Sequence, residues 1–210
     1  KLQKRLEQEG VKAERIEQIP YAFVISEFDH LTGLSSFQDG WFYVQDISSM
    51  SVAQAADPKK DDYIIDVCAA PGGKSSHLAE LLGGSGMVEA RDLTEYKVGL
   101  IEENIQRHDL KNMKAVQQDA TILDEASIKK ADILICDLPC SGLGVIGRKS
   151  DIRYKMTAEK AHDLALLQQQ MLDTVCAYVK CGGKLIYSTC TIHKEENEDN
   201  VAAFLKKHPE

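Results

Sequence analysis

The 210-residue sequence has neither a long apolar run nor an excess of positive charge. It contains no stretch of about 18 apolar residues, so we expect no membrane span. No basic segment followed by an apolar one opens the chain, so we expect no signal peptide. Repeats and low-complexity tracts are also lacking. With 43% hydrophobic and 28% charged residues, the composition excludes collagen, coiled coil and wholesale disorder. One domain, or one domain with a small appendage, is expected at this length.

Clustered positive charge is scarce, since the formal net charge is −8. Phosphate binding requires grouped Lys and Arg, so this balance argues against a broad nucleic-acid surface. The segment 148–155 is the one local exception, with Arg148, Lys149, Arg153 and Lys155 set against Asp151. Both a phosphate-contacting role for Arg148, Lys149 and Arg153 and a merely solvated basic loop are open interpretations.

Disulfide and zinc frameworks are not indicated by the six cysteines. Without a signal peptide these thiols are expected to stay reduced in a cytoplasmic protein. The pairs Cys136/Cys140 and Cys176/Cys181 do not have C-x-x-C spacing, and no His lies at ligand spacing, so we expect no metal. Cys136, Cys176 and Cys181 are interpreted as buried small hydrophobes.

From residue 61 onward, short apolar runs alternate with helical patterns. Helices are expected at 74–82, 94–108 and 158–180, and Gly182 and Gly183 are expected to end the last of these. The acidic residues at 195–199 are interpreted as favourable charges at the start of a final helix. Strands are expected at 63–68, 87–91, 114–118, 131–137 and 184–188. This alternation predicts an α/β fold with a parallel sheet covered on both faces. Residues 1–40 are expected to form a small appendage, and residues 41–210 the main domain.

The segment 66–74, DVCAAPGGK, lies at the first strand-to-helix turn. Its two glycines allow a ligand to approach the backbone, and the helix that follows offers free N–H groups. The segment is neither a dinucleotide fingerprint nor a phosphate-binding loop. Asp92, Asp119 and Asp137 end the next three strands, where an acid can bind ribose hydroxyls, although each alone is equally consistent with loop capping. Acids without a phosphate cradle suit a cationic nucleoside, S-adenosylmethionine.

Two cysteines follow neighbouring strands, Cys140 in DLPCSGLG and Cys190 in STCT. The carboxyl ends of parallel strands converge, so both thiols are expected to face one pocket. A thiol beside a methyl donor suits methylation of cytosine, because a thiolate added to carbon 6 makes carbon 5 nucleophilic. Since a free thiol is only a few per cent ionised near neutral pH, the site must lower a thiol pKa. This chemistry alone leaves open which cysteine attacks, because DNA cytosine-5 methyltransferases use the thiol of a Pro-Cys motif.

The sequences DVCAAPGGKSSHLAELL, DLPCSGLGVIGRKSDIRY and YSTCTIHKEENEDNV closely resemble the Sun-type (NSUN/RsmB-like) RNA 5-methylcytosine methyltransferases. The resemblance extends from about Phe37 to Leu205. It implies a Rossmann-like class I methyltransferase sheet and an RNA-binding N-terminal extension, which fits the appendage at 1–40. The family sheet ends in an antiparallel strand hairpin that this sequence does not reach, and the first residue is Lys1. We therefore expect a piece of a longer chain.

The resemblance also implies roles for individual residues. Cys190 would attack carbon 6, Cys140 would assist breakdown of the adduct, and Asp137 would contact the base beside the cofactor. Asp92 would bind the ribose and Asp119 the adenine of S-adenosylmethionine. The rest of the cofactor would lie against Cys68, Ala69, Ala70, Pro71, Gly72, Gly73 and Lys74.

The expected function is S-adenosylmethionine-dependent RNA (cytosine-5) methylation through a covalent cysteine adduct, with rRNA favoured over tRNA and a monomer as the acting form. A methyltransferase for a small molecule or protein is disfavoured, because direct transfer to oxygen or nitrogen needs no thiol pair. A non-catalytic RNA-binding remnant is the remaining alternative, which the intact Cys140 and Cys190 disfavour.

Overall fold

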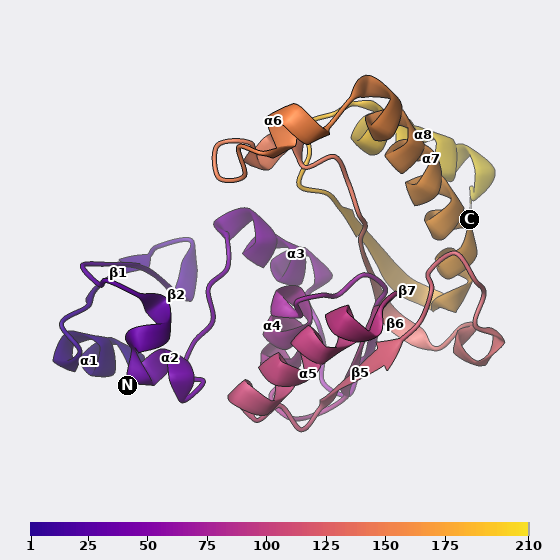
Figure 1. Ribbon diagram of the computed structural model, residues 1–210. Coiled ribbons are helices and arrows are strands. Elements are labelled where there is room, and N and C mark those ends of the chain that lie inside the picture. Colours follow the sequence, from indigo (N-terminus) through magenta and orange to yellow (C-terminus); the bar gives the residue numbers. More distant parts are fainter. Residues whose placement is uncertain (210) are drawn as a thin grey trace.

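A five-stranded parallel sheet forms the centre of the computed structural model, which describes residues 1–209 (Figure 1). The spatial order of its strands is β5-β4-β3-β6-β7. The chain therefore changes direction across the sheet between β3 and β6, and ligands of such folds bind beside that switch, at the carboxyl ends of the strands. The predicted α/β class is confirmed. The strands are β3 (Tyr63–Asp66), β4 (Met87–Asp92), β5 (Met113–Gln117), β6 (Ala131–Asp137) and β7 (Val179–Ser188).

Helices cover both faces of the sheet (Figure 1). One face packs against α3 (Ile47–Ala56), α4 (Gly73–Leu81) and α5 (Glu95–His108). The other packs against α7 (Ala158–Val175) and α8 (Asn200–Lys207). Consecutive residues of a strand point to opposite faces, so a strand covered twice must be apolar at both. Ile64 and Ile65 show this directly, since each is fully buried in a different cluster.

The N-terminal residues form a small unit with its own core (Figure 1). It consists of α1 (Leu2–Gln8), an antiparallel hairpin of β1 (Lys12–Ile16) and β2 (Ile19–Ser26), and the short α2 (Ser35–Gln38). Leu6, Val11 and Leu34 are its buried centre. The weak polarity pattern of residues 11–25 did not reveal the hairpin, because both strands alternate irregularly between buried and exposed positions.

The boundary between α7 and β7 differs from the prediction. The helix was expected to continue to residue 180, but it ends at Val175 and a 3-10 turn (Cys176–Tyr178) leads into the strand at Val179. Gly182 and Gly183 lie within β7, where the pairing register with β6 shifts. A Cβ on Gly183 would lie 3.0 Å from the carbonyl oxygen of Ala131, so glycine permits this close approach.

The remaining elements are short. They are 3-10 turns at Leu31–Gly33, Glu125–Ser127 and Leu143–Val145, the helix α6 (Ile152–Lys155), and the π-helical turn η5 (Glu195–Asp199), which leads directly into α8. Within residues 1–209, no helix combines the length and apolar character needed to cross a bilayer.

Candidate active site

The glycine turn after β3 has the form that a ligand approaching the backbone requires. Gly72 has a φ of +107°, a region that side-chain-bearing residues rarely adopt, and it immediately precedes α4. A Cβ on Gly73 would meet no atom within 4 Å. Open space therefore lies beside the first turn of α4, where backbone N–H groups have no partner within the helix.

Three carboxylates contact the residues of this turn and of the first turn of α4. Asp92 accepts from the N–H of Ala70 at 3.0 Å, and it also accepts from the N–H of Leu93 at 2.8 Å. Asp137 contacts the ammonium of Lys74 at 2.6 Å. Asp66 accepts from the hydroxyl of Ser75 at 2.6 Å. The turn is thus surrounded by acids and carries no cluster of Arg or Lys that would bind a phosphate.

Asp66 is the first residue of the segment 66–74, but the sequence analysis assigned it no role. Its side chain is almost completely buried, and its Oδ1 finds no hydrogen-bond partner among residues 1–209. Burial is the main cause that raises its pKa from 3.8 to about 7. Its position at the end of a buried strand, directly before a glycine turn, was the available signal.

These features fit S-adenosylmethionine. An unpaired buried carboxylate oxygen favours a cation. Lys74 and Lys97 are the basic residues in contact with the acids of this turn, and each is paired with a carboxylate, Asp137 at 2.6 Å and Asp92 at 2.9 Å, so neither is free to bind a phosphate. Asp119 differs from the expectation in its contacts, because its carboxylate accepts from the N–H and the hydroxyl of Thr121, at 2.8 and 2.7 Å. Those are the contacts of a loop-capping residue, so its predicted contact with adenine is not supported by its surroundings.

The two predicted catalytic cysteines lie side by side. The sulfur atoms of Cys140 and Cys190 are 3.3 Å apart, although 50 positions separate the residues in the chain. The backbone N–H of Cys190 also donates to the sulfur of Cys140 at 3.3 Å. The expectation that both thiols face one place is confirmed. Gly144 allows this packing, since a Cβ there would lie 2.8 Å from the carbonyl oxygen of Cys190.

The pKa values of the two thiols are shifted in opposite directions. A hydrogen bond from the Cys140 S–H lowers the pKa of Cys190 to about 6, against the opposing effects of burial and of Asp137. The positive charges of Lys149 and Lys74 lower it further. The same hydrogen bond and burial raise the pKa of Cys140. Near neutral pH, Cys190 is therefore the thiolate and Cys140 holds a proton.

Asp137 lies between the glycine turn and the cysteine pair. It contacts Lys74 from α4, and its other oxygen accepts from the hydroxyl of Ser188 at 2.7 Å. Ser188 is the last residue of β7, two positions before Cys190. The Lys74 side chain, predicted to bind cofactor, thus points at Asp137 and stabilises its charge beside the thiolate.

The other four cysteines lie apart from this pair. Cys136 is buried, as expected, and Cys176 is partly buried. Cys181 is exposed, which contradicts the expected burial, because it lies in the irregular part of β7 rather than in a helix. Burial is the main cause that raises the pKa of Cys68 to about 12. The described residues hold no group of three or more His, Cys, Asp or Glu side chains arranged as metal ligands.

Only some of the positive side chains in the predicted basic segment 148–155 are available to bind phosphate. Arg148 forms an ion pair with Asp46, which lies just before α3. Lys149 is close enough to Cys190 to influence its pKa. Arg153 is exposed in α6. Sequence reasoning missed the partner of Arg148 because Asp46 lies 102 positions away.

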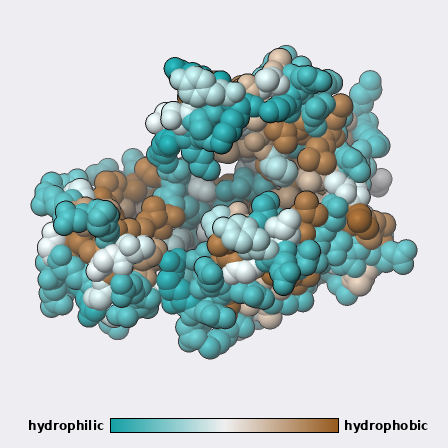
Figure 2. Space-filling view, viewed as in Figure 1, coloured by the Kyte–Doolittle hydropathy of each residue, from teal (hydrophilic) through white to brown (hydrophobic). Residues whose placement is uncertain are grey.

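A groove lies between the N-terminal unit and the loop that follows Cys140. It has a volume of about 800 Å³ and lies between β2 and the loop after β6. Figure 2 shows a hollow between the N-terminal unit and the rest of the molecule. Phe23 and Ile25 line one wall, and Gly144 and Arg148 line the other. Gly144 also donates its N–H to the carbonyl of Cys190 at 3.1 Å, so one residue of the groove wall contacts the backbone of the reactive cysteine.

The sheet order, the glycine turn and the acids around it define a Rossmann-like fold of the S-adenosylmethionine-dependent methyltransferase class. A family model described as 16S rRNA methyltransferase RsmB/F matches residues 53–210, and the chain belongs to that family. The expected resemblance to Sun-type enzymes is thereby confirmed.

Individual relatives agree with this assignment. A probable ribosomal RNA small subunit methyltransferase B of Bacillus subtilis is 42% identical over 181 residues, 86% of this chain and 40% of that protein. A tRNA (cytosine(72)-C(5))-methyltransferase of Pyrococcus horikoshii is 40% identical over 84% of this chain and 44% of that protein. The crystal structure of NSun6 from Pyrococcus horikoshii with SFG, an analogue of S-adenosylmethionine, superposes with a TM-score of 0.79. It is 38% identical, over 89% of this chain and 48% of that one. The chain thus spans less than half the length of these relatives.

Proposed function

We propose that this chain carries the catalytic centre of an S-adenosylmethionine-dependent RNA (cytosine-5)-methyltransferase. The observation that carries the proposal is the pair of sulfur atoms 3.3 Å apart at the ends of β6 and β7. Direct methyl transfer to oxygen or nitrogen needs no such pair, whereas activation of carbon 5 of a pyrimidine needs a nucleophile at carbon 6. The names of relatives that act on rRNA and tRNA support an RNA substrate.

The residues of the glycine turn and its acids would hold the cofactor. The segment from Cys68 to Lys74 would lie along it, Asp92 would accept from its ribose hydroxyls, and Asp66 would face a positively charged group. In the bound state the cofactor supplies the methyl group. Asp119 is the weakest member of the proposed set, because its carboxylate is already engaged by Thr121.

Cys190 would act as the nucleophile. Its thiolate adds to carbon 6 of cytosine, and a sulfur–carbon bond forms while the electron pair of the 5,6 double bond moves toward carbon 5. Asp137 would contact the base, held in place by Lys74 and Ser188. After carbon 5 has gained the methyl group, loss of its proton and cleavage of the sulfur–carbon bond restore the aromatic ring and the thiolate.

Cys140 would serve the second half of the reaction. It lies beside the sulfur that must leave and holds a proton when Cys190 is ionised. A thiol in that place can assist the proton transfers that accompany breakdown of the adduct. The opposite assignment, with Cys140 as nucleophile, is disfavoured because Cys190 lies in the STC motif, which the resemblance to Sun-type enzymes identifies as the nucleophile's. The lowered pKa of Cys190 and the raised pKa of Cys140 agree with this choice.

The RNA would enter through the groove between β2 and the loop after β6. A base inside a helical stack cannot reach the thiolate, so the target would be unpaired or splayed out. Phe23 offers an aromatic ring on one wall, with the guanidinium of Arg15 5.4 Å from the ring centre, and Lys149 directly follows Arg148 of the other wall. The N-terminal unit would thus contact the RNA.

We place rRNA ahead of tRNA because the matching family model describes 16S rRNA enzymes. Bisulfite sequencing of cellular RNA, with and without the full-length protein, tests this directly. One or more cytosines of the small-subunit rRNA are expected to lose methylation when the protein is absent. Loss confined to tRNA would overturn the choice of substrate, and no loss in any RNA would overturn the proposed function.

A further inference from the structure

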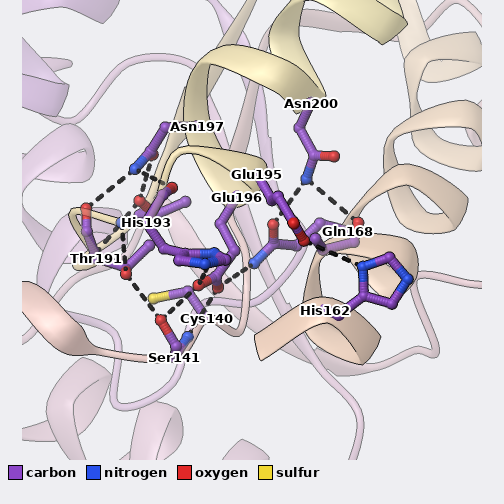
Figure 3. Close-up of polar contacts among 12 residues, drawn as sticks. Cys140, Ser141, His162, Gln168, Thr191, His193, Glu195, Glu196, Asn197 and Asn200 are labelled. Atoms are coloured by element: carbon purple, nitrogen blue, oxygen red, sulfur yellow. Dashed lines mark hydrogen bonds and ion pairs between the residues drawn. The ribbon is translucent and has the colours of Figure 1, made fainter. Parts of the chain in front are cut away.

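A buried carboxylate lies behind the cysteine pair and touches neither sulfur. Glu196 is fully buried in the π-helical turn η5 (Figure 3). It accepts from the backbone N–H of Ser141 at 2.8 Å and from the side chain of Gln168 at 3.0 Å. The hydroxyl of Ser141 donates to its other oxygen. The sequence analysis interpreted this residue as one of several favourable charges at a helix start and did not identify its burial.

These contacts join the two loops that carry the sulfurs. Ser141 directly follows Cys140, and its hydroxyl lies 2.7 Å from the hydroxyl of Thr191. Thr191 directly follows Cys190. One carboxylate therefore holds the first loop directly, and it reaches the second loop through the Ser141 hydroxyl and through His193, whose Nδ1 lies 3.6 Å away (Figure 3).

Gln168 of α7 extends the same network on the other side of Cys140. Its amide nitrogen donates to the carbonyl of Pro139 at 2.8 Å, so both neighbours of Cys140 are held. Its amide oxygen accepts from the hydroxyl of Tyr187 at 3.0 Å and from Asn200 at 2.8 Å. A buried network satisfied in this way is rigid, and the loss of one member leaves several groups unpaired.

We propose that Glu196 is a positioning residue, which sets the separation of the Cys140 and Cys190 sulfurs through Ser141, Thr191 and Gln168. The inference rests on the proposed function only in taking these two cysteines as the reacting pair. Position matters here because hydrogen bonds weaken steeply as their geometry departs from the optimum, and one hydrogen bond keeps the proton on Cys140 and the charge on Cys190.

The proposed role requires a side chain at position 196 that accepts hydrogen bonds, and not merely one that fills the space. In Glu196→Gln the amide oxygen can still accept from the Ser141 N–H and from Gln168, while its NH₂ group donates to the Ser141 hydroxyl. That hydroxyl then donates to Thr191, so the groups of Ser141 and Gln168 keep their partners. In Glu196→Ala the Ser141 N–H and the Gln168 amide lose their shared acceptor, and the loops are free to separate.

The test measures the pH dependence of alkylation at Cys190 by iodoacetamide, with the modified peptide quantified by mass spectrometry. The groups that act on this thiol are Cys140 from the loop after β6, Asp137 from β6, Lys149 from the basic loop and Lys74 from α4. His193 is the titratable group that faces the Glu196 carboxylate, at 3.6 Å, and it is retained in every variant compared. The unmodified chain is expected to show a midpoint at about pH 6. Glu196→Ala is expected to raise that midpoint by about one pH unit or more, toward the ordinary value for a thiol.

Two variants serve as controls. Glu196→Gln is expected to restore the midpoint of the unmodified chain. Glu195→Ala removes a neighbouring exposed acid that pairs with His162, and it should leave the midpoint unchanged. A folded Glu196→Ala protein with an unaltered midpoint overturns the inference, as does a Glu196→Gln midpoint as high as that of the alanine variant.

Ser141→Ala provides an independent test if Glu196→Ala does not fold. Ser141→Ala keeps the backbone N–H that Glu196 binds but removes the hydroxyl between the loops, so the midpoint should rise; an unaltered midpoint overturns the inference. The readout needs neither RNA nor methyl donor. If the variants raise the midpoint while the unmodified protein methylates no RNA, the positioning role is supported and the proposed function is refuted.

Discussion

Asp66 offers the sharpest energetic test of the cofactor end of the site. Its carboxyl is almost completely buried, one oxygen has no partner among residues 1–209, and only Ser75 donates to the other. Burial disfavours the charged form and raises the pKa from 3.8 to about 7. Asp66→Asn removes the ionisable group and keeps its size, so the variant should be more stable than the unmodified chain at alkaline pH.

The direction follows from where the proton is bound. Between pH 3.8 and about 7 the folded chain holds a proton on Asp66 that the unfolded chain has released. Stability from this group is therefore greatest at low pH and is lost as the pH rises to about 7. At about 1.4 kcal/mol for each pH unit, the whole loss is about 4 kcal/mol, most of which falls between about pH 5 and pH 8.

The assay is urea unfolding of both proteins at about pH 5 and pH 8. The free energy of unfolding of Asp66→Asn, relative to that of the unmodified chain, should rise by about 3 kcal/mol between the two conditions. Any constant cost of altering the Ser75 contact cancels in this comparison. Asp61→Asn, at an exposed position, is the matched control and should show no such rise. An equal difference at both pH values would refute the raised pKa of the buried Asp66 carboxyl.

Further predictions concern the cysteines and the cofactor. Cys190→Ala should abolish methyl transfer to a cytosine-containing RNA, measured with a radiolabelled methyl donor, because no thiolate remains to attack carbon 6. Cys140→Ala should accumulate a protein–RNA adduct that survives a denaturing gel, because breakdown of the adduct slows. Asp92→Ala should weaken binding of S-adenosylmethionine in calorimetry. It should also destabilise the fold by about 1–3 kcal/mol, because Ala70 and Leu93 lose a buried acceptor.

Each of these has an outcome that contradicts it. Full activity of Cys190→Ala would remove that residue as the nucleophile. Normal turnover without adduct in Cys140→Ala would exclude a role in release. Asp92→Asn keeps one acceptor oxygen and so separates folding from binding. Unchanged affinity in a folded Asp92→Asn protein, together with unchanged affinity in Asp92→Ala, would exclude ribose binding by this residue.

The sheet and the cysteine pair were predictable because their signals are local and repeat in a regular way. Strands buried on both faces are recognisable as short apolar runs, and each functional loop directly follows such a run. The convergence of Cys140 and Cys190 then follows from the rule that carboxyl ends of parallel strands share one edge. The end of α7 was misplaced because Val179 continues its apolar spacing, and only the pairing of Val179 with Ala131 shows that the strand has begun.

What could not be predicted depends on contacts between distant segments. Glu196 lies among acidic neighbours that favour a helix start, and nothing local indicates that Ser141 and Gln168 bury it. The engagement of Arg148 by Asp46 is likewise a long-range contact. Asp66 and Asp119 both follow strands, yet only the structure shows that the first contacts the helix after the glycine turn and the second caps its own loop.

The central claim is that the Cys190 thiolate forms a bond to carbon 6 of an RNA cytosine. It is tested most directly with an RNA in which 5-fluorocytosine replaces the target cytosine, since fluorine at carbon 5 cannot leave as a proton does and the adduct cannot break down. The protein is incubated with this RNA and S-adenosylmethionine, and the cross-linked peptide is identified by mass spectrometry. A covalent complex through Cys190 is predicted; a cross-link through Cys140, or no complex with an RNA that the protein methylates in its unmodified form, would contradict the account.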